Sequence, residues 1–303
     1  MTHSITPQPV IVTGAAGFIG QHVLSLLRDR PYPVLAVDRV PPAWPLPTGI
    51  QFHQTDLADP ATVIPGSFAI DEGFVLVHLA WNMQRGDAYA AQAESVIRLA
   101  SLLDYWRERV LERVVGIGSA EEYGNRSGRL RESDPSGDLL SPYGWAKRCA
   151  GQLVTAWGHK FAKPVFWVRP FLVYGPGQQG SMMLPYAWAR AKAGERAKFT
   201  DGLQQRDFVF VTDVAAAIVA AIEAPHAGQH VVNIGTGVAT PVRKVLSRLG
   251  TLMHAEHLFD FGARPRRPEE PAQQCADIQV ARDVLDWQPR VDWRSGIEQV
   301  AAD

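Results

Sequence analysis

The amino-acid sequence predicts an α/β fold, in which a doubly wound parallel sheet is combined with a smaller C-terminal substrate-binding lobe. In the first half, short apolar runs alternate with helical patterns, the order expected of parallel strands joined by crossover helices. The runs VIVTG and FVLVHLA are almost continuously apolar, as expected of strands that are buried on both faces. A glycine-rich turn, VTGAAGFIG, joins the first apolar run to the first helical pattern.

The composition favours a small-molecule partner. Across 303 residues, Lys+Arg 30 and Asp+Glu 31 give a net charge of -1, so the basic field that would suggest nucleic-acid binding is missing. The two cysteines, Cys149 and Cys275, do not form a disulfide framework or have the close companions of a zinc site, which predicts a reducing, cytoplasmic location and no metal.

Neither a signal peptide nor a membrane span is predicted. The N-terminus lacks a basic start followed by an apolar core. The longest apolar run, VAAAIVAAI at 214–222, is shorter than the roughly 20 residues that cross a bilayer, and it reads as a buried helix. We therefore expect no membrane partner.

The predicted elements follow in order along the chain. After VIVTG come a helix in AGFIGQHVLSLLRDR, strands in PVLAVD, IQFHQTDL and GFVLVHLA, a helix around 87–109, and a strand in LERVVGIGS. Beyond FWVRPF at 166–171 we expect a helix near 182–194, a strand in RDFVFV, a helix at 213–223 and a strand in HVVNIG. We predict a nucleotide-binding domain over 1–170 and a lobe over 171–303, from which some segments return to the first domain.

The glycine-rich turn predicts a dinucleotide site. Gly14, Gly17 and Gly20 are spaced as G-x-x-G-x-x-G between a strand and an amphipathic helix. Glycines there permit a tight turn, allow the backbone to approach a pyrophosphate, and let the helix start close to the sheet. This context indicates a Rossmann-type domain that binds NAD, or alternatively NADP.

Three charged residues bear on the cofactor. Asp38 ends the second strand, where an acid accepts hydrogen bonds from the adenosine ribose and disfavours a 2'-phosphate, which favours NAD. Arg39 beside it weakens that inference, since arginine suits a 2'-phosphate. Asp56 follows the third strand and is either a contact to adenine or a helix N-cap.

The stretch SPYGWAK places a tyrosine and a lysine on one helix face. Ser141 is a good N-cap and Pro142 suits the first helical position, which predicts a helix starting here. Tyr143 and Lys147, four residues apart, then point into the same space. A nearby ammonium favours the phenolate, so the pair is a candidate acid/base couple. By itself the spacing also fits an ordinary helix surface.

These motifs, in this order, resemble the extended short-chain dehydrogenase/reductase family, in its nucleotide-sugar epimerase, dehydratase and reductase branch. The resemblance rests on TGAAGFIG, TDL, HLA at 78–80, GSAEEYG at 118–124, YGWAK, RPFLVYGPGQ, RDFVFVTDVAAAI, NIGTG and RPEEPAQQCAD. It covers nearly the whole chain.

The resemblance implies roles for single residues. Tyr143 exchanges the proton of a sugar hydroxyl, Lys147 assists it and binds the nicotinamide ribose, and Ser119 orients the sugar oxygen. The implied cofactor-binding residues are Gly14, Gly17, Phe18, Ile19, Gly20, Asp38, Arg39, Asp56, Leu57, Leu79, Ala80, Tyr143, Lys147 and Pro170.

The implied substrate is a nucleotide-diphosphate sugar. Arg206 and Arg267 are candidates for its pyrophosphate, because a planar fork of donors suits phosphate oxygens. Glu270 is a candidate for a ribose hydroxyl; an exposed charge is the other reading of these three residues. Ser119 is a candidate for the sugar, and so are Met83 and Trp81, whose side-chain types are more often found in a core. Leu172 stands where the family often has asparagine, so one polar contact to the phosphate is missing.

Three reactions of this branch involve hydride transfer at the sugar C4 and a 4-keto species. We rank a 4-epimerase first, an NADPH-dependent 4-ketoreductase second, and a 4,6-dehydratase or decarboxylase third. Glu121 stands where related dehydratases carry a glutamate, but its neighbour Ala120 cannot assist the loss of water; capping of the next loop is the other reading of Glu121. A dinucleotide-binding regulatory module without turnover is a hypothesis from another class.

The family usually forms homodimers through a four-helix bundle, which implies an interface on the segments 87–109 and 143–162. The apolar stripe in AYAAQAESVIRLASLLDYW agrees with this, although packing against the sheet would produce the same pattern.

Overall fold

The computed structural model describes residues 8–70, 73–83, 88–107, 111–138, 141–179 and 182–303. The chain divides into two compact units. The first comprises Met1–Glu122, Ser141–Arg169 and Ala215–Val232, and the second comprises Tyr123–Leu140, Pro170–Val214 and Asn233–Asp303. Both units are therefore assembled from segments that are distant in the sequence.

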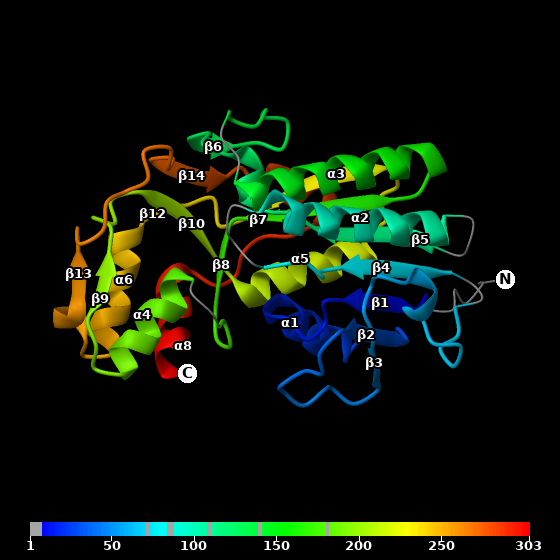
Figure 1. Ribbon diagram of the computed structural model, residues 1–303, viewed down its shortest axis with the longest axis horizontal. Coiled ribbons are helices and arrows are strands. Elements are labelled where there is room, and N and C mark those ends of the chain that lie inside the picture. The colour runs from blue at the N-terminus through cyan, green and yellow to red at the C-terminus, as the bar shows by residue number, and fades with distance from the viewer. Residues whose placement is uncertain (1–7, 71–72, 84–87, 108–110, 139–140, 180–181) are drawn as a thin grey trace. The chain divides into compact units, whose positions relative to one another are not determined.

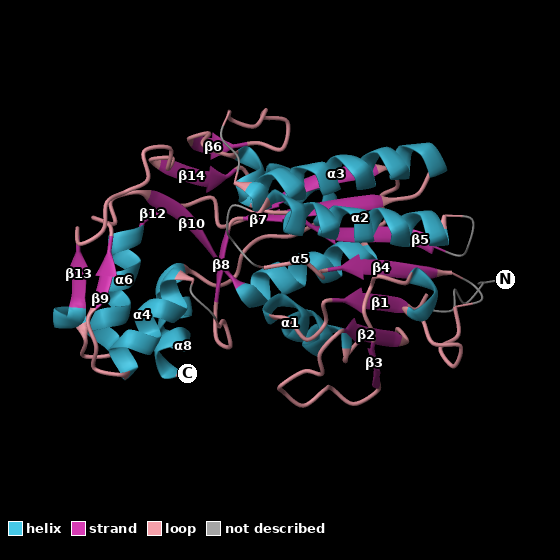
Figure 2. Ribbon diagram, viewed as in Figure 1, coloured by secondary structure: helices cyan, strands magenta, loops and turns pink. Residues whose placement is uncertain are grey.

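A seven-stranded sheet forms the centre of the first unit (Figures 1 and 2). Its strand order is β11-β7-β5-β4-β1-β2-β3, and the pairs from β7 to β3 are parallel. The strands are β1 (Val10–Thr13), β2 (Val34–Asp38), β3 (Ile50–Gln54), β4 (Phe74–His78), β5 (Leu111–Ile117), β7 (Val165–Pro170) and β11 (Gln229–Ile234). The predicted doubly wound sheet is confirmed.

The strand order reverses between β1 and β4. β1 pairs with β2 on one side and with β4 on the other, and Thr13 lies opposite His78 at the carboxyl ends. In open parallel sheets, ligands bind in the crevice that such a reversal opens beyond the carboxyl ends of the strands. The glycine-rich turn after β1 and the segment after β4 meet at this place.

Helices cover both faces of this sheet. They are α1 (Phe18–Leu27), α2 (Tyr89–Trp106), α3 (Pro142–Phe161) and most of α5 (Val211–Glu223). α2 and α3 lie side by side (Figure 1) and share one core with the inward side chains of the strands. That core is built from Ile11, Leu35, Val37, Val63, Phe68, Phe74, Leu76, Leu99, Leu102, Leu103, Trp106, Leu111, Val114, Ala150, Val154, Trp157, Val165 and Trp167.

The second unit has its own sheets and core. Its larger sheet runs β12-β10-β14-β6, with β8 also paired to β10, and β9 pairs with β13. The strands are β6 (Gly128–Leu130), β8 (Leu172–Tyr174), β9 (Ala197–Phe199), β10 (Gln205–Phe210), β12 (Ala239–Pro241), β13 (Phe259–Phe261) and β14 (Gln273–Ala276). The helices are α4 (Met183–Lys192), α6 (Val242–Leu252), α7 (Gln279–Leu285) and α8 (Trp293–Ala302).

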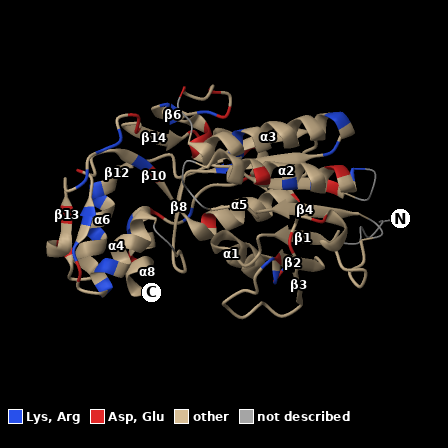
Figure 3. Cartoon of the chain, viewed as in Figure 1, with Lys and Arg blue, Asp and Glu red and all other residues tan. Residues whose placement is uncertain are grey.

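Among the described residues there are also three 3-10 helices: η1 (Pro60–Thr62), η2 (Ala120–Tyr123) and η3 (Glu256–Leu258). Positive and negative residues alternate along α2 (Figure 3), where Arg98 pairs with Glu94 one turn away.

In the part of the chain that the structure describes, none of the helices has both the length and the hydrophobicity needed to cross a bilayer.

Candidate active site

The glycine-rich turn lies against the segment that follows β4. Gly14 has a φ of +71°, and a Cβ there would lie 2.4 Å from the Ala80 backbone nitrogen. A Cβ on Gly20 would lie 2.5 Å from the Ala15 carbonyl oxygen, so α1 starts directly on the turn. Gly17 is the N-cap of α1, and no acidic residue occupies the first turn, which begins with Phe18 and Ile19. The turn therefore fits a pyrophosphate, which needs close backbone approach and a helix N-terminus without negative charge.

Asp38 is fixed beside this turn. Its Oδ2 accepts a hydrogen bond from the Ala16 N–H at 3.0 Å, and its Oδ1 accepts one from the Val40 N–H at 3.3 Å. Arg39 is exposed, and its carbonyl accepts a hydrogen bond from the Gln54 amide at 3.1 Å. The carboxylate thus sits next to the pyrophosphate loop, at the position where an adenosine ribose is expected.

Asp56 has partners within its own unit. Its Oδ1 accepts the Ala58 N–H at 2.8 Å and pairs with Arg98. The N-cap of η1 is Asp59, which accepts the Ala61 N–H, so the alternative reading of Asp56 as a helix N-cap is wrong. The side chain of the next residue, Leu57, packs against the hydrophobic core of the unit.

A buried histidine underlies the same place. The Oγ1 of Thr13 and the Nδ1 of His78 are 2.9 Å apart, and His78 is 3% exposed. Burial lowers the pKa of His78 to about 3, and the charge of Lys147 acts in the same direction. The ring is therefore neutral at pH 7. Leu79 donates its N–H to the Thr13 carbonyl at 2.9 Å, which holds Leu79 and Ala80 beside the turn.

The predicted helix start at SPYGWAK is confirmed. Ser141 is the N-cap of α3 and its Oγ accepts the Gly144 N–H at 3.0 Å, while Pro142 occupies the first helical position. Tyr143 and Lys147 follow in the first two turns and are 8% and 1% exposed. The reading of this stretch as an ordinary helix surface is therefore wrong, because both side chains are buried.

The buried Lys147 ammonium contacts a backbone carbonyl and the face of an aromatic ring. Its Nζ donates to the Ile117 carbonyl at 2.8 Å and lies 3.6 Å from the centroid of the Trp81 ring. The Tyr143 ring centroid lies 5.8 Å from the same Nζ. The Trp81 indole is held by the Gln92 side chain, whose Oε1 accepts its N–H at 2.9 Å. A carbonyl and an aromatic face both offset the cost of burying a cation.

Ser119 and Glu121 connect the end of β5 to the start of α3. The Oγ of Ser119 accepts the Glu121 N–H at 3.1 Å, and Oε2 of Glu121 accepts the Ser141 O–H at 2.7 Å. A Cβ on Gly144 would lie 2.5 Å from the Glu121 carbonyl oxygen, so only glycine allows this approach without a shift. The serine-bearing turn and the tyrosine-bearing helix are thereby held together.

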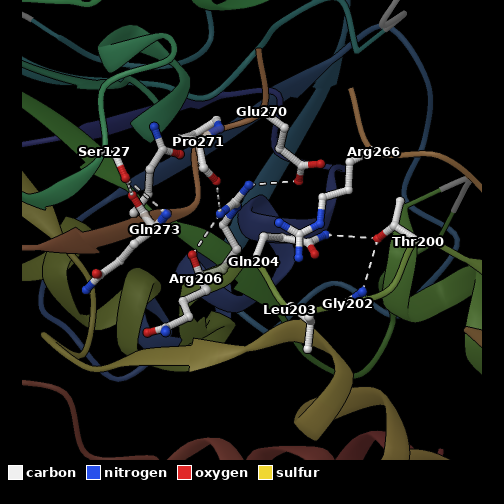
Figure 4. Close-up of polar contacts among 12 residues, drawn as sticks. Ser127, Thr200, Gly202, Leu203, Gln204, Arg206, Arg266, Glu270, Pro271 and Gln273 are labelled. Atoms are coloured by element: carbon white, nitrogen blue, oxygen red, sulfur yellow. Dashed lines mark hydrogen bonds and ion pairs between the residues drawn. The ribbon is translucent and has the colours of Figure 1, made fainter. Parts of the chain in front are cut away.

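In the second unit, Arg206 and Glu270 contact each other (Figure 4). Arg206 Nη2 lies 2.8 Å from Glu270 Oε1, and Nη1 donates to the Pro271 and Gln205 carbonyls at 2.9 and 2.8 Å. Burial lowers the pKa of Arg206, and Glu270 opposes this effect. The two residues that were predicted to bind different parts of the substrate therefore form a pair.

The remaining candidates occupy more varied places. Arg267 is exposed, and its carbonyl accepts the Glu270 N–H at 3.0 Å. Its neighbour Arg266, which the sequence did not single out, binds Asp201 at 2.5 Å. Met83 is 58% exposed. Pro170 is the buried end of β7, and Leu172 begins β8 and packs against the core of the second unit.

Comparison with known proteins gives concordant results. The family model described as "NAD dependent epimerase/dehydratase family" matches residues 10–235. The chain is 28% identical to an uncharacterized UDP-glucose epimerase, YtcB, of Bacillus subtilis, over 95% of both chains.

Two solved structures show the same fold. MoeE5 in complex with UDP-glucuronic acid and NAD is 30% identical with a TM-score of 0.85, covering 96% of this chain and 97% of that one. UDP-glucuronic acid 4-epimerase of Bacillus cereus, in complex with UDP-glucuronic acid and NAD, is 28% identical with a TM-score of 0.85, covering 97% and 98%.

Proposed function

Because this chain belongs to the NAD-dependent epimerase/dehydratase family, we propose that it binds NAD and interconverts the C4 epimers of a UDP-sugar. Hydride transfer at C4 would pass through a 4-keto species. The observation that carries the proposal is the buried pair Tyr143 and Lys147, joined through Ser141 and Glu121 to the turn that bears Ser119. The complexes of MoeE5 and of the Bacillus cereus epimerase with UDP-glucuronic acid support this substrate class.

The roles of the three residues follow from their contacts. Bound NAD supplies the site that accepts and returns the hydride. Tyr143 takes the proton of the C4 hydroxyl, and the buried Lys147 charge favours the phenolate that does so. Since the Ser119 oxygen accepts the Glu121 N–H, its own O–H is left to donate to the sugar oxygen.

Arg206 and Glu270 are proposed to bind the nucleotide part of the substrate. Arg206 is 14% exposed at its side chain and already has a carboxylate partner, so a phosphate would share the guanidinium with Glu270. A second, exposed guanidinium is available at Arg267. The prediction for substrate binding is that Arg206→Lys raises KM more than it lowers kcat, because lysine is a single point donor.

The proposal is tested with purified protein and no added cofactor. The protein is heat-denatured and the released dinucleotide is identified; then native protein is incubated with UDP-glucuronic acid and with UDP-glucose, and the epimers are separated by chromatography. We expect bound NAD and formation of a C4 epimer from one of these sugars. Tyr143→Phe is expected to lower kcat by about 10²–10⁴-fold, the range of general acid–base catalysis. Full turnover by the Tyr143→Phe variant would contradict the proposal.

The contacts of Glu121 favour epimerisation over dehydration. A dehydratase needs a further base for C5, whereas the Glu121 carboxylate accepts the Ser141 O–H at 2.7 Å and thereby supports α3. The exposed Arg39 beside Asp38 favours the ketoreductase alternative. The ketoreductase alternative predicts that the purified protein releases no dinucleotide on denaturation and that it binds NADPH better than NADH.

We also propose a homodimer through α2 and α3. Ile97 and Tyr89 on α2 are 64% and 52% exposed, and the Tyr89 ring contacts Trp145 of α3 at 5.7 Å between centroids. Light scattering should give twice the mass of the 303-residue chain, and Ile97→Asp should shift it to the monomer mass.

A further inference from the structure

Glu122 is a buried carboxylate at the end of the serine-bearing turn. It is 1% exposed, and it accepts hydrogen bonds from two segments of the first unit, the turn after β5 and the strand β7. Its Oε1 accepts the Ser119 N–H at 2.9 Å and the Trp167 Nε1–H at 2.9 Å. Its Oε2 accepts the Arg169 Nε–H at 2.8 Å. The carboxylate therefore joins the turn after β5 to two residues of β7.

Three glycines make the space for this network. A Cβ on Gly118 would lie 2.3 Å from Glu122 Oε1, and one on Gly116 would lie 2.5 Å from the Trp167 ring. A Cβ on Gly151 of α3 would lie 2.6 Å from Trp167 Nε1. Any larger residue at these positions would displace the carboxylate or the indole, so the local sequence is suited to this arrangement.

Burial of the charged Glu122 carboxylate costs free energy, so stabilisation of the fold alone does not account for this network. A nearly dry carboxylate loses its hydration, and its pair with Arg169, which is 15% exposed at its side chain, restores only part of that loss. Apolar residues of similar volume are often no less stabilising than such a pair. An acceptor of fixed direction does something that an apolar residue does not: it sets the orientation of the donors that it binds.

The donor that matters is the backbone N–H of Ser119. This residue is held from two sides, because its N–H binds Glu122 and its Oγ accepts the Glu121 N–H. With the N–H held by Glu122, a rotation about the N–Cα bond of Ser119 would move the hydroxyl and break its bond with the Glu121 N–H. The Glu122 carboxylate is thus placed to fix the direction in which the Ser119 hydroxyl points.

We infer that Glu122 is a positioning residue for Ser119 and that its carboxylate, through Oε1, sets the hydroxyl that orients the sugar oxygen. The inference rests on the proposed function, in which Ser119 acts on the C4 oxygen. It assigns no contact with substrate to Glu122 itself. Misplacement of a reacting group by about 1 Å can cost on the order of 100-fold in rate, so the effect belongs in kcat.

A matched pair of double variants tests this role. Glu122→Gln/Arg169→Met keeps a carbonyl oxygen that accepts hydrogen bonds from Ser119 and Trp167. It also removes the Arg169 guanidinium, whose N–H would otherwise face the NH2 group of the glutamine. Glu122→Met/Arg169→Met fills the same volume without an acceptor. We expect the methionine form to have a kcat lower by about tenfold to a hundredfold than the glutamine form, with a similar KM and the same amount of bound NAD. Equal kcat values would overturn the inference.

A second background separates this inference from the function itself. Ser119→Ala protein has no hydroxyl to position. In this background, Glu122→Met/Arg169→Met should therefore give the same residual kcat as Glu122→Gln/Arg169→Met. A further loss specific to methionine would show a role other than positioning Ser119, and the inference would be wrong. If Ser119→Ala alone had the wild-type kcat, the proposed role of Ser119 would fail, and its positioning by Glu122 would fail with it.

If the methionine form does not fold, the single variant Glu122→Gln is compared with wild type. The glutamine NH2 and the Arg169 N–H are both donors and cannot pair, which should displace the amide. We expect a lower kcat in Glu122→Gln, and we expect Arg169→Met to restore it. An unchanged kcat in Glu122→Gln would overturn the inference.

Discussion

The Lys147 ammonium lies 3.6 Å from the centroid of the Trp81 ring, although the two residues are far apart in the sequence. Lys147 is 1% exposed, so the ring face takes the place of water beside its ammonium. A desolvated cation over an indole is stabilised by about 2 kcal/mol. The tryptophan after β4 thereby supports the lysine that we propose to act with Tyr143.

Replacing Trp81 should therefore destabilise the protein, and the loss should be smaller when the new side chain is aromatic. We expect Trp81→Leu to lower the free energy of unfolding by at least about 1 kcal/mol more than Trp81→Phe, which keeps an aromatic face. Urea denaturation measures both. Because phenylalanine also loses the N–H bonded to Gln92, equal losses in the two variants would mean that the ring face contributes nothing.

Gly14→Ala should be far more damaging than its size suggests. The new Cβ would meet the Ala80 backbone nitrogen at 2.4 Å and the residue would also be strained at a φ of +71°. Gly49→Ala is the matched control, because Gly49 has a φ of +87° but nothing within 4 Å of its Cβ position. We expect the control to cost about 1–2 kcal/mol of unfolding free energy and Gly14→Ala to cost more and to abolish retention of NAD. Equal effects would show that strain alone matters.

Asp38→Asn should change the preference between cofactors. The amide oxygen still accepts the Ala16 N–H, but the negative charge that opposes a 2'-phosphate is gone. We expect the ratio of the Kd for NADP to the Kd for NAD to fall by roughly tenfold, which corresponds to about 1.4 kcal/mol. Calorimetric titration of the cofactor-free protein measures both constants. Arg39→Gln should move the ratio in the opposite direction, and an unchanged ratio in both variants would refute these assignments.

His78 should make the protein less stable in mild acid. The folded-state pKa of about 3 lies below the unfolded value of 6.5, so the unfolded chain takes up a proton at a higher pH. Above pH 6.5 both states are neutral, and as the pH falls below it the folded state loses up to about 1.4 kcal/mol per pH unit.

His78→Asn removes this titration and keeps a polar group near Thr13. The difference in unfolding free energy between wild type and variant should be constant from pH 8 to 7 and should shift in favour of the variant from pH 6 to 5. Denaturation curves at these pH values measure it, and a difference that does not depend on pH would contradict the predicted burial of the neutral ring.

Much of the framework was predictable because it depends on local patterns. The apolar runs, the Ser141-Pro142 helix start and the glycine spacing each act within a few residues, and their periods and capping preferences are read directly from the chain. The Tyr143–Lys147 pair belongs to this class, since a helix alone places residues four apart on one face.

The partners of these residues depend on distant segments. Trp81 contacts Lys147 only because β4 and α3 belong to one compact unit. In the sequence Glu121 and Glu122 are equivalent, but in the fold the Glu122 carboxylate is buried and binds the Ser119 N–H, whereas the Glu121 carboxylate binds Ser141. Arg206 and Glu270, predicted as independent ligands, pair across 64 positions. Such contacts follow from packing and desolvation in three dimensions, which period and spacing along the chain do not encode, so they became visible only in the folded molecule.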